Sequence, residues 1–278
     1  MNMYSGQIIA APPVLVAAER RRSLAPARPN RYLHLIGPAS LLLCWSFLSA
    51  AGWLDPRTLP APWTAVSTGA DLLREGQIQE RLAVSIARVA TGFTLGGAAG
   101  LLLALLSALS PLGLYLIDGV VQLKRGIPVL AAVAFILVWS GTTEPVTEAA
   151  IALAAFSPIY LLTHNALRTV DIRYVELAET LNLSRAQFVK AVILPGALAG
   201  FVRGLRFGAA AAWLVLAAAE QVDATGGIGD MVALASNEVQ PDVIMVGLGI
   251  YGLLGLATDY GLRGFEQLLL ASRRSFGQ

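Results

Sequence analysis

The sequence predicts an all-helical protein that crosses a membrane about six times. Of its 278 residues, 56% are hydrophobic and only 14% are charged, whereas a soluble domain carries about 25% charged residues. The apolar residues also gather in segments of about 20 residues, the length that a helix needs to span a bilayer. The same composition excludes an intrinsically disordered chain. A formal net charge of +2 is too small to indicate a nucleic-acid-binding protein.

Six apolar segments follow one another along the chain, separated by polar or turn-forming residues. Their approximate bounds are 33–53, 86–109, 114–139, 146–167, 197–219 and 243–262. Pro111 and Gly113 predict a tight turn after the second segment, and Gly126 and Pro128 predict a kink within the third. The amphipathic stretch 63–81 would either lie on the outer membrane surface or pack against the helices, and both alternatives stay open.

The distribution of basic residues predicts the orientation of the chain. With six spans, both termini and the loop 168–195 share one side, which carries 14 of the 20 Lys and Arg residues, against four on the other side. The termini and this loop are therefore expected to be cytoplasmic. The expected organisation is a flexible cytoplasmic arm over residues 1–31, a six-helix transmembrane domain over 32–265 and a cytoplasmic tail over 266–278.

The residue inventory offers little chemistry of its own. Cys44 is the one cysteine and lies in an apolar segment, and His34 and His164 are too far apart in sequence for a local metal motif. Lys124 and Lys190 are the two lysines and each follows an apolar residue, whereas a phosphate-binding loop requires Gly-Lys-Ser/Thr. We therefore expect no metal site, no cofactor bound by this chain and no ATP hydrolysis by that route.

The loop 168–195 carries the clearest local signals, which predict two short helices. Asp171 can cap the start of the first helix, and Asn182 suits its end because asparagine tolerates the left-handed conformation. Ser184 and Gln187 have the spacing of a capping box at the start of the second helix, and Pro195 is expected to end it. From the residues alone, a docking element and an ordinary interfacial loop are equally compatible with this pattern.

This loop resembles the cytoplasmic signature of ATP-binding-cassette (ABC) importer permeases, Glu-Ala-Ala-x3-Gly-x9-Ile-x-Leu-Pro. Glu176, Ala178, Leu194 and Pro195 match the signature, and Asn182 stands in place of its glycine. The resemblance continues over roughly residues 50 to 265 and is closest to the nitrate/sulfonate/taurine branch. It is carried by the segments Leu59–Pro62, Gly126–Pro128, Ile193–Leu198, Gly204–Phe207, Ala218–Glu220 and Gly226–Gly229. Gly52–Leu54, Phe156–Tyr160 and Ile193–Leu198 are most similar to aliphatic-sulfonate permeases.

The resemblance implies a pore-forming subunit of an importer in the bacterial inner membrane, with the fold of type I ABC importer permeases. Implied partners are two copies of an ATPase subunit that uses ATP and Mg, a second permease subunit in a homodimer, and a periplasmic or lipid-anchored solute-binding protein. The implied cargo is an alkanesulfonate or taurine, with nitrate, bicarbonate or another small solute as alternatives. An ion-coupled secondary transporter is the alternative outside this class. The implied coupling residues are Glu176, Ala178, Asn182, Ser184, Leu194 and Pro195.

Charged residues inside apolar segments are costly and rarely face lipid, so they are candidates for the substrate pathway. Arg125 lies beside the break expected at Pro128 and would attract an oxoanion there; alternatively it reaches the membrane edge or pairs with Asp118. Pro128 and Glu220 are the other pathway candidates, and Glu220 would either contact the binding protein or cap the loop Gly226–Gly229.

Small residues recur at intervals of four in two of the apolar segments. The stripes are Gly92, Gly96 and Gly100 in the second segment and Gly204, Gly208 and Ala212 in the fifth. This spacing lets helices approach closely. It predicts tight packing within the protein and contact between two copies of the chain.

Overall fold

The computed structural model describes residues 35–140, 144–169, 171–223 and 226–271. The expected arm over 1–31 and residues 272–278 of the expected tail lie outside this part of the chain. The chain divides into two compact units, residues 1–44 and 45–278. In the first unit the described residues form the beginning of α1, where Ser40 Oγ donates a hydrogen bond to Gly37 O at 2.8 Å. All contacts described below lie within the second unit.

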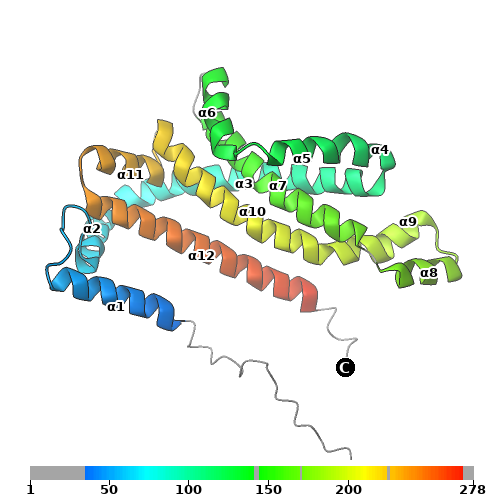
Figure 1. Ribbon diagram of the computed structural model, residues 1–278, viewed down its shortest axis with the longest axis horizontal. Coiled ribbons are helices and arrows are strands. Elements are labelled where there is room, and N and C mark those ends of the chain that lie inside the picture. The colour runs from blue at the N-terminus through cyan, green and yellow to red at the C-terminus, as the bar shows by residue number, and fades with distance from the viewer. Residues whose placement is uncertain (1–34, 141–143, 170, 224–225, 272–278) are drawn as a thin grey trace, which may run out of the picture. The chain divides into compact units, whose positions relative to one another are not determined.

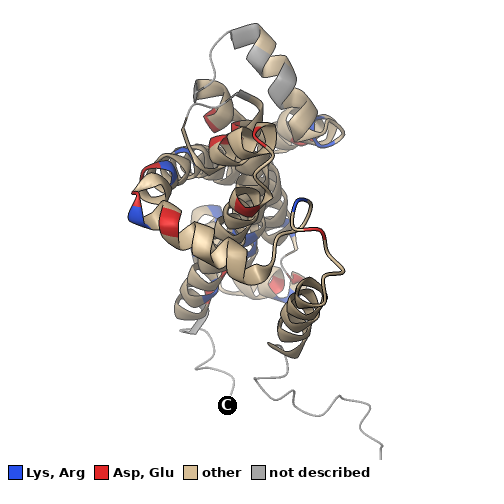
Figure 2. Ribbon diagram, turned by 90° about the vertical axis from the view of Figure 1, so that its left-hand side faces the viewer, with Lys and Arg blue, Asp and Glu red and all other residues tan. Residues whose placement is uncertain are grey.

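Every regular element of the described chain is helical. In order they are α1 (Ile36–Ala50), α2 (Pro62–Arg74), α3 (Gln77–Leu109), α4 (Pro111–Gly113), η2 (Leu114–Asp118), α5 (Gly119–Arg125), α6 (Val129–Ser140), α7 (Glu144–Arg168), α8 (Ile172–Thr180), α9 (Arg185–Phe188), η3 (Val189–Ile193), α10 (Leu194–Asp223), α11 (Ile228–Asn237) and α12 (Pro241–Ala271). The elements η2 and η3 are π-helical turns. Charged residues are sparse along these helices (Figure 2).

The core of the second unit forms around α7. Both α3 and α10 pack along α7, and α12 packs against α10 and α2 (Figure 1). Ile151, Ile159 and Tyr160 of α7 are completely buried. Since α7 is enclosed by its two neighbours, it is the element against which the others are positioned.

The two small-residue stripes explain why these helices pack so closely. A Cβ atom placed on Gly96 of α3 would lie 2.2 Å from the carbonyl oxygen of Ala152 on α7, and one on Gly204 of α10 would lie 2.9 Å from Ile159 Cα. Both stripes therefore face α7 inside the chain, and the prediction of tight packing is confirmed. They are covered there, so they do not supply the surface that was also expected to join two copies.

Four helical segments in the described chain are long and apolar enough to cross a membrane, namely 77–109, 145–168, 185–222 and 241–269. The first expected span appears as α1, an apolar helix of 15 residues. The third is interrupted, because α5 ends at Arg125 and α6 begins at Val129. The kink predicted there is a complete break. The backbone turns through Gly126 and Ile127, whose N–H groups bond to Leu123 O and Lys124 O at 3.1 Å, and Pro128 has no N–H to continue the ladder.

The amphipathic stretch 63–81 divides between two helices. Its first part forms α2, which packs against α12, where Thr68 Oγ1 donates to Asp242 Oδ2 at 2.7 Å. Residues from Gln77 onward begin α3. Of the two alternatives, packing against the helices is the one observed.

Candidate functional site

The first helix of the loop 168–195 begins and ends as its sequence predicts. The Asp171 side chain accepts a hydrogen bond from the Arg173 N–H at 3.0 Å and caps α8. Asn182 adopts a left-handed φ of 48° just after this helix. The N–H groups of Asn182 and Leu183 bond back to the carbonyls of Glu179 and Ala178, both at 3.0 Å. These two bonds form a Schellman motif, so asparagine performs the turn for which glycine is usual.

The second helix begins with the predicted capping box. Ser184 Oγ accepts from the Gln187 N–H at 3.3 Å, and Gln187 Oε1 accepts from the Ser184 N–H at 2.9 Å. Arg185 then donates to the carbonyl oxygen of Leu109, the last residue of α3, at 3.0 Å. The capped helices of residues 171–193 are here called the loop element. This element follows α7 and precedes α10 in the chain, and Arg185 also binds it to the end of α3.

The expectation that Pro195 ends the second helix is wrong. Helical backbone continues from Arg185 through Pro195 to Val222. The π-helical turn η3 precedes the proline, and the Leu194 N–H bonds to Val189 O. A π-turn changes the hydrogen-bond register at the point where a proline lacks its donor and crowds the preceding carbonyl, so the helix can accommodate it.

The loop element presents an uncovered apolar face. Tyr174, Leu177 and Leu181 are 53–60% exposed and have the i, i+3, i+7 spacing of one helical face. Glu176 is also exposed, while Ala178 is buried. Of the signature residues, Ala178 therefore supports the element from within, and Glu176 lies on its surface. A rigid, capped helix with an exposed apolar face is suited to docking another protein.

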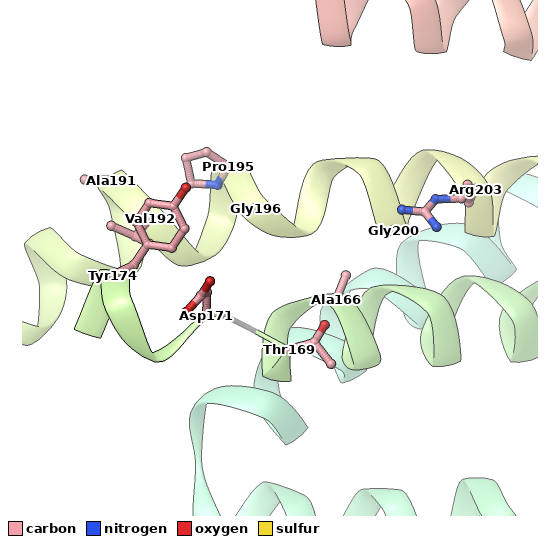
Figure 3. A pocket seen from close by; sticks show the side chains of 10 residues that line it. All are labelled: Ala166, Thr169, Asp171, Tyr174, Ala191, Val192, Pro195, Gly196, Gly200 and Arg203. Atoms are coloured by element: carbon pink, nitrogen blue, oxygen red, sulfur yellow. The ribbon is translucent and has the colours of Figure 1, made fainter. Parts of the chain in front are cut away.

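A groove of about 580 Å³ lies between α8 and the continuous helix of η3 and α10, beside the end of α7. Figure 3 shows its lining, with Asp171 and Tyr174 on the α8 side, Pro195 on α10, and Arg203 farther along α10. Gly196 and Gly200 contribute no side chain to the groove, and Ala166 contributes only a methyl group. The groove leaves room beneath the loop element on the side facing α10.

The structure places Arg125 and Pro128 at the break between α5 and α6, and both are exposed. Arg125 donates to Gln122 Oε1 at 2.8 Å. The alternative pairing with Asp118 is not observed: in the described chain, Asp118 accepts a hydrogen bond from Tyr160 Oη at 3.2 Å. A role for Arg125 and Pro128 in a substrate pathway stays a prediction.

Glu220 is the centre of a buried polar cluster, here called the Glu220 cluster. Its side chain is 0% exposed and pairs with the Arg88 guanidinium at 3.0 Å. Ser85 Oγ lies 2.9 Å from both carboxylate oxygens, Tyr251 Oη donates to Glu220 at 3.0 Å, and the Gly229 N–H donates at 2.9 Å. These groups come from α3, α10, α11 and α12, so one carboxylate joins four helices.

The Glu220 cluster also fixes the loop that leads into α11. Arg88 donates to Gly226 O at 2.8 Å, and the Ile228 N–H donates to Ser85 Oγ at 2.9 Å. Glu220 accepts from the first turn of α11, where a negative charge is stabilised by the helix dipole. These contacts correspond to the loop-capping alternative for Glu220. Its buried side chain presents no surface to another protein in this structure, and its place beside the substrate pathway stays a prediction.

Sequence reasoning missed the partners of Glu220. Arg88 was counted only as one of four basic residues on the outer side, and Ser85 and Tyr251 were not considered. The available signal was a pair of opposite charges on the same predicted side of the membrane, with Arg88 at the start of the second apolar segment and Glu220 just after the end of the fifth. Two such charges are expected to pair, but nothing in the spacing shows that they meet.

Comparison with known proteins identifies the family. Residues 96–269 match the family described as "Binding-protein-dependent transport system inner membrane component". A protein of Escherichia coli strain K12 that is named as a putative aliphatic sulfonates transport permease is 36% identical to this chain, and the match covers 84% of this chain and 89% of the relative. A protein of the same name from Bacillus subtilis strain 168 is 34% identical, and the match covers 87% of this chain and 88% of the relative. The taurine transport system permease protein of Escherichia coli is 29% identical over 83% of this chain and 86% of the relative.

The fold has a counterpart among solved structures. A chain of "an amino acid ABC transporter with histidines" superposes with a TM-score of 0.59 at 18% sequence identity, covering 73% of this chain and 96% of that chain. This match shows a shared fold. The family match, in turn, identifies the protein as an inner-membrane component of a binding-protein-dependent transport system. The chain therefore belongs to the family of inner-membrane permease components of binding-protein-dependent ABC transporters, in which the ATPase is a separate chain.

Proposed function

We propose that the chain forms the pore of an ATP-driven importer for a small anionic nutrient, an alkanesulfonate or taurine, delivered by a solute-binding protein. The observation that carries this proposal is the 36% identity to a relative named for aliphatic sulfonates over 84% of the chain. Nitrate, bicarbonate or another small solute of the same class is the alternative cargo.

The loop element is the proposed contact with the ATPase. Its apolar face of Tyr174, Leu177 and Leu181 would be covered by the ATPase, and Glu176 lies beside it. The caps at Asp171 and Ser184 and the left-handed turn at Asn182 keep the element rigid. Rigidity is required because closure of the ATPase can bias the permease only through an element that moves as a unit. Leu194 and Pro195 are the first two residues of α10 and follow the loop element directly.

The proposed assembly contains two copies of this chain, two ATPase subunits and one binding protein. Six spans per chain are proposed, in which α1 forms the first and the broken series α4 to α6 forms the third. Both termini and the loop element then lie in the cytoplasm, on the side with the excess of Arg and Lys. The Glu220 cluster lies toward the outer face in this orientation.

The test is growth of a strain that lacks the gene. Alkanesulfonates and taurine are supplied in turn as the sole sulfur source, with sulfate as the control, and nitrate is supplied separately as the sole nitrogen source. The proposal predicts that growth fails on sulfonates only and returns when the gene is restored. If growth failed on nitrate alone, the assignment as a permease would stand and the proposed cargo would change to nitrate. Unimpaired growth on every sulfonate would overturn the proposed cargo.

A further inference from the structure

Three of the helical segments that are long and apolar enough to cross a membrane have one end at the same pocket. The first of them ends at Leu109, the second ends at Arg168 and the third begins at Arg185. All three residues line a pocket of about 390 Å³, together with Ser107, Ser110, Leu114 and Tyr115. Because the apolar segments end there, the pocket lies where the helices leave the hydrocarbon core, at the level of the lipid head groups.

The pocket is positively charged. Arg168 at the end of α7 and Arg185 at the start of α9 are both exposed, and no Asp or Glu of the described chain lines the pocket with them. Neither guanidinium forms a salt bridge with a described carboxylate. Arg185 donates one hydrogen bond, to Leu109 O, which leaves most of its N–H donors available. Two like charges that line one pocket favour an anion between them.

Hydroxyl groups add uncharged donors to the same pocket. Ser110 Oγ accepts from the Gly113 N–H at 3.4 Å, so its own hydrogen is available to a ligand. Ser107 is only 1% exposed, which shows that the pocket extends below the surface of the helices. Guanidinium groups present N–H donors in a planar fork that matches phosphate oxygens. The arginines and the Ser110 hydroxyl therefore suit a phosphate group better than a neutral ligand.

An apolar surface lies directly beside the charged pocket. Leu112, Tyr115 and Leu116 are 67%, 80% and 62% exposed, and they lie close together in the first turns of the helix that begins at Pro111. Tyr115 also lines the pocket, so the apolar surface and the pocket are continuous. Acyl chains are as apolar as leucine side chains and cover such a surface in a bilayer. Pocket and surface together match the head group and the chains of a phospholipid.

We propose that this pocket binds the head group of an anionic phospholipid, with the phosphate between Arg168 and Arg185 and the acyl chains against Leu112 and Leu116. The inference rests on the proposed function for one point, the cytoplasmic position of the loop element. Anionic lipids are abundant in that leaflet, and basic pockets between membrane-spanning helices bind their head groups there. The lipid connects the end of α7 to α9 and so holds the loop element against the membrane. A soluble phosphate ester carries the same head-group chemistry, so the experiment separates the two sources.

The test uses the assembled transporter, with its ATPase, purified in detergent. The shift in Tm is measured as dioctanoylphosphatidylglycerol is added, and the concentration that gives half of the shift is the apparent affinity. Dioctanoylphosphatidylcholine has the same chains without net charge, and glycerol phosphate has the charge without chains. The wild type should respond to the anionic lipid and little to the other two. The shift should nearly disappear in about 1 M salt, because the Debye length is then only about 3 Å.

Variants test the two arginines. Arg168→Gln should weaken the apparent affinity about fivefold, since a basic residue near anionic lipid contributes about that factor, and Arg168→Lys should keep part of it. Arg168→Gln together with Arg185→Gln should abolish the shift. Without lipid, Arg168→Gln should have the Tm of the wild type, because no hydrogen bond or ion pair within the described chain is lost. The control is Arg173→Gln, which removes an exposed cation of α8 that does not line the pocket and should leave the affinity unchanged.

The outcomes separate this inference from the proposed function. An equal shift in the wild type and the double variant would overturn the site, even if sulfonate uptake is intact. An equal response to glycerol phosphate would overturn the lipid in favour of a soluble ligand. No lipid shift in the wild type, combined with loss of ATPase co-purification in Arg168→Gln, would assign the arginines to the ATPase contact instead. An arginine-dependent lipid shift in a transporter that does not take up sulfonates would support the site and overturn the proposed cargo.

Discussion

Replacing Glu220 by alanine is expected to destabilise the protein by about 3–5 kcal/mol, because removing one partner of a buried ion pair is strongly destabilising. The Arg88 side chain is 6% exposed and that of Glu220 is 0% exposed, so solvent screens this pair little. The substitution also removes the shared acceptor of Ser85, Gly229 and Tyr251. A buried donor without an acceptor costs about 1–3 kcal/mol, and water that enters the space left by the side chain offsets part of that cost.

The effect is measured as thermal unfolding of the purified permease in detergent. At about 2–4 °C per kcal/mol for a chain of this size, Glu220→Ala should lower Tm by roughly 6–20 °C. Glu220→Gln keeps the shape and one acceptor oxygen, and should give a smaller loss. Arg88→Met combined with Glu220→Leu removes both charges and should recover part of the stability, because a buried pair can be replaced by apolar groups at little cost.

Two results would refute this reasoning. A Tm of Glu220→Ala within about 2 °C of the wild type would show that the Glu220 cluster does not hold the four helices together. A double variant as unstable as the sum of the two single variants would show that Arg88 and Glu220 act independently.

Three further predictions concern packing, the loop turn and docking. Gly96→Ala should lower the free energy of unfolding by about 1–3 kcal/mol, because the added methyl group overpacks against a backbone carbonyl of α7. Gly119→Ala is the control and should leave Tm unchanged, because a Cβ there meets nothing within 4 Å. Equal Tm losses in the two variants would contradict the close packing of α3 against α7. Asn182→Val should lower the free energy of unfolding by about 1–2 kcal/mol, because a β-branched residue disfavours the left-handed conformation. Asn182→Gly should keep the stability of the wild type, and denaturant titration of the variants measures the difference. Leu177→Glu should abolish co-purification of the ATPase, whereas Glu179→Gln, on the same helix, should not. If Leu177→Glu still bound the ATPase, the apolar face of Tyr174, Leu177 and Leu181 would not be the docking surface.

Signals that act within a few residues were sufficient to predict the loop element. The caps at Asp171 and Ser184 and the turn at Asn182 depend on bonds between residues two to five positions apart, so the sequence contains all the participants. The apolar segments were also recognisable, because crossing a bilayer requires length and composition in one continuous stretch. The small-residue stripes predicted close packing without showing which helix they would meet.

The features that the sequence did not predict depend on contacts between residues distant in sequence, or on several local effects that act on the same residues. Ser85 and Glu220 are separated by 135 positions, and no periodicity shows that they meet. Pro195 was expected to end a helix because proline lacks a donor, yet the π-turn before it and the continued apolar face outweigh that local cost. The break at Gly126–Pro128 was underestimated as a kink for the opposite reason, since glycine and proline act there together.

The continuity through Pro195 bears on how the loop element and the Glu220 cluster are connected. Residues 185–222 form one helical segment of 38 residues, which at 1.5 Å per residue extends over about 57 Å. The loop element lies at one end of this segment and Glu220 at the other. A displacement of α9 therefore reaches the Glu220 cluster through one helix, and η3 with Pro195 is the place where that helix can bend. A helix ending at Pro195 would have put a flexible joint between the proposed docking surface and the rest of α10. We expect the continuous helix to carry the motion, with α7 as the support along which it moves.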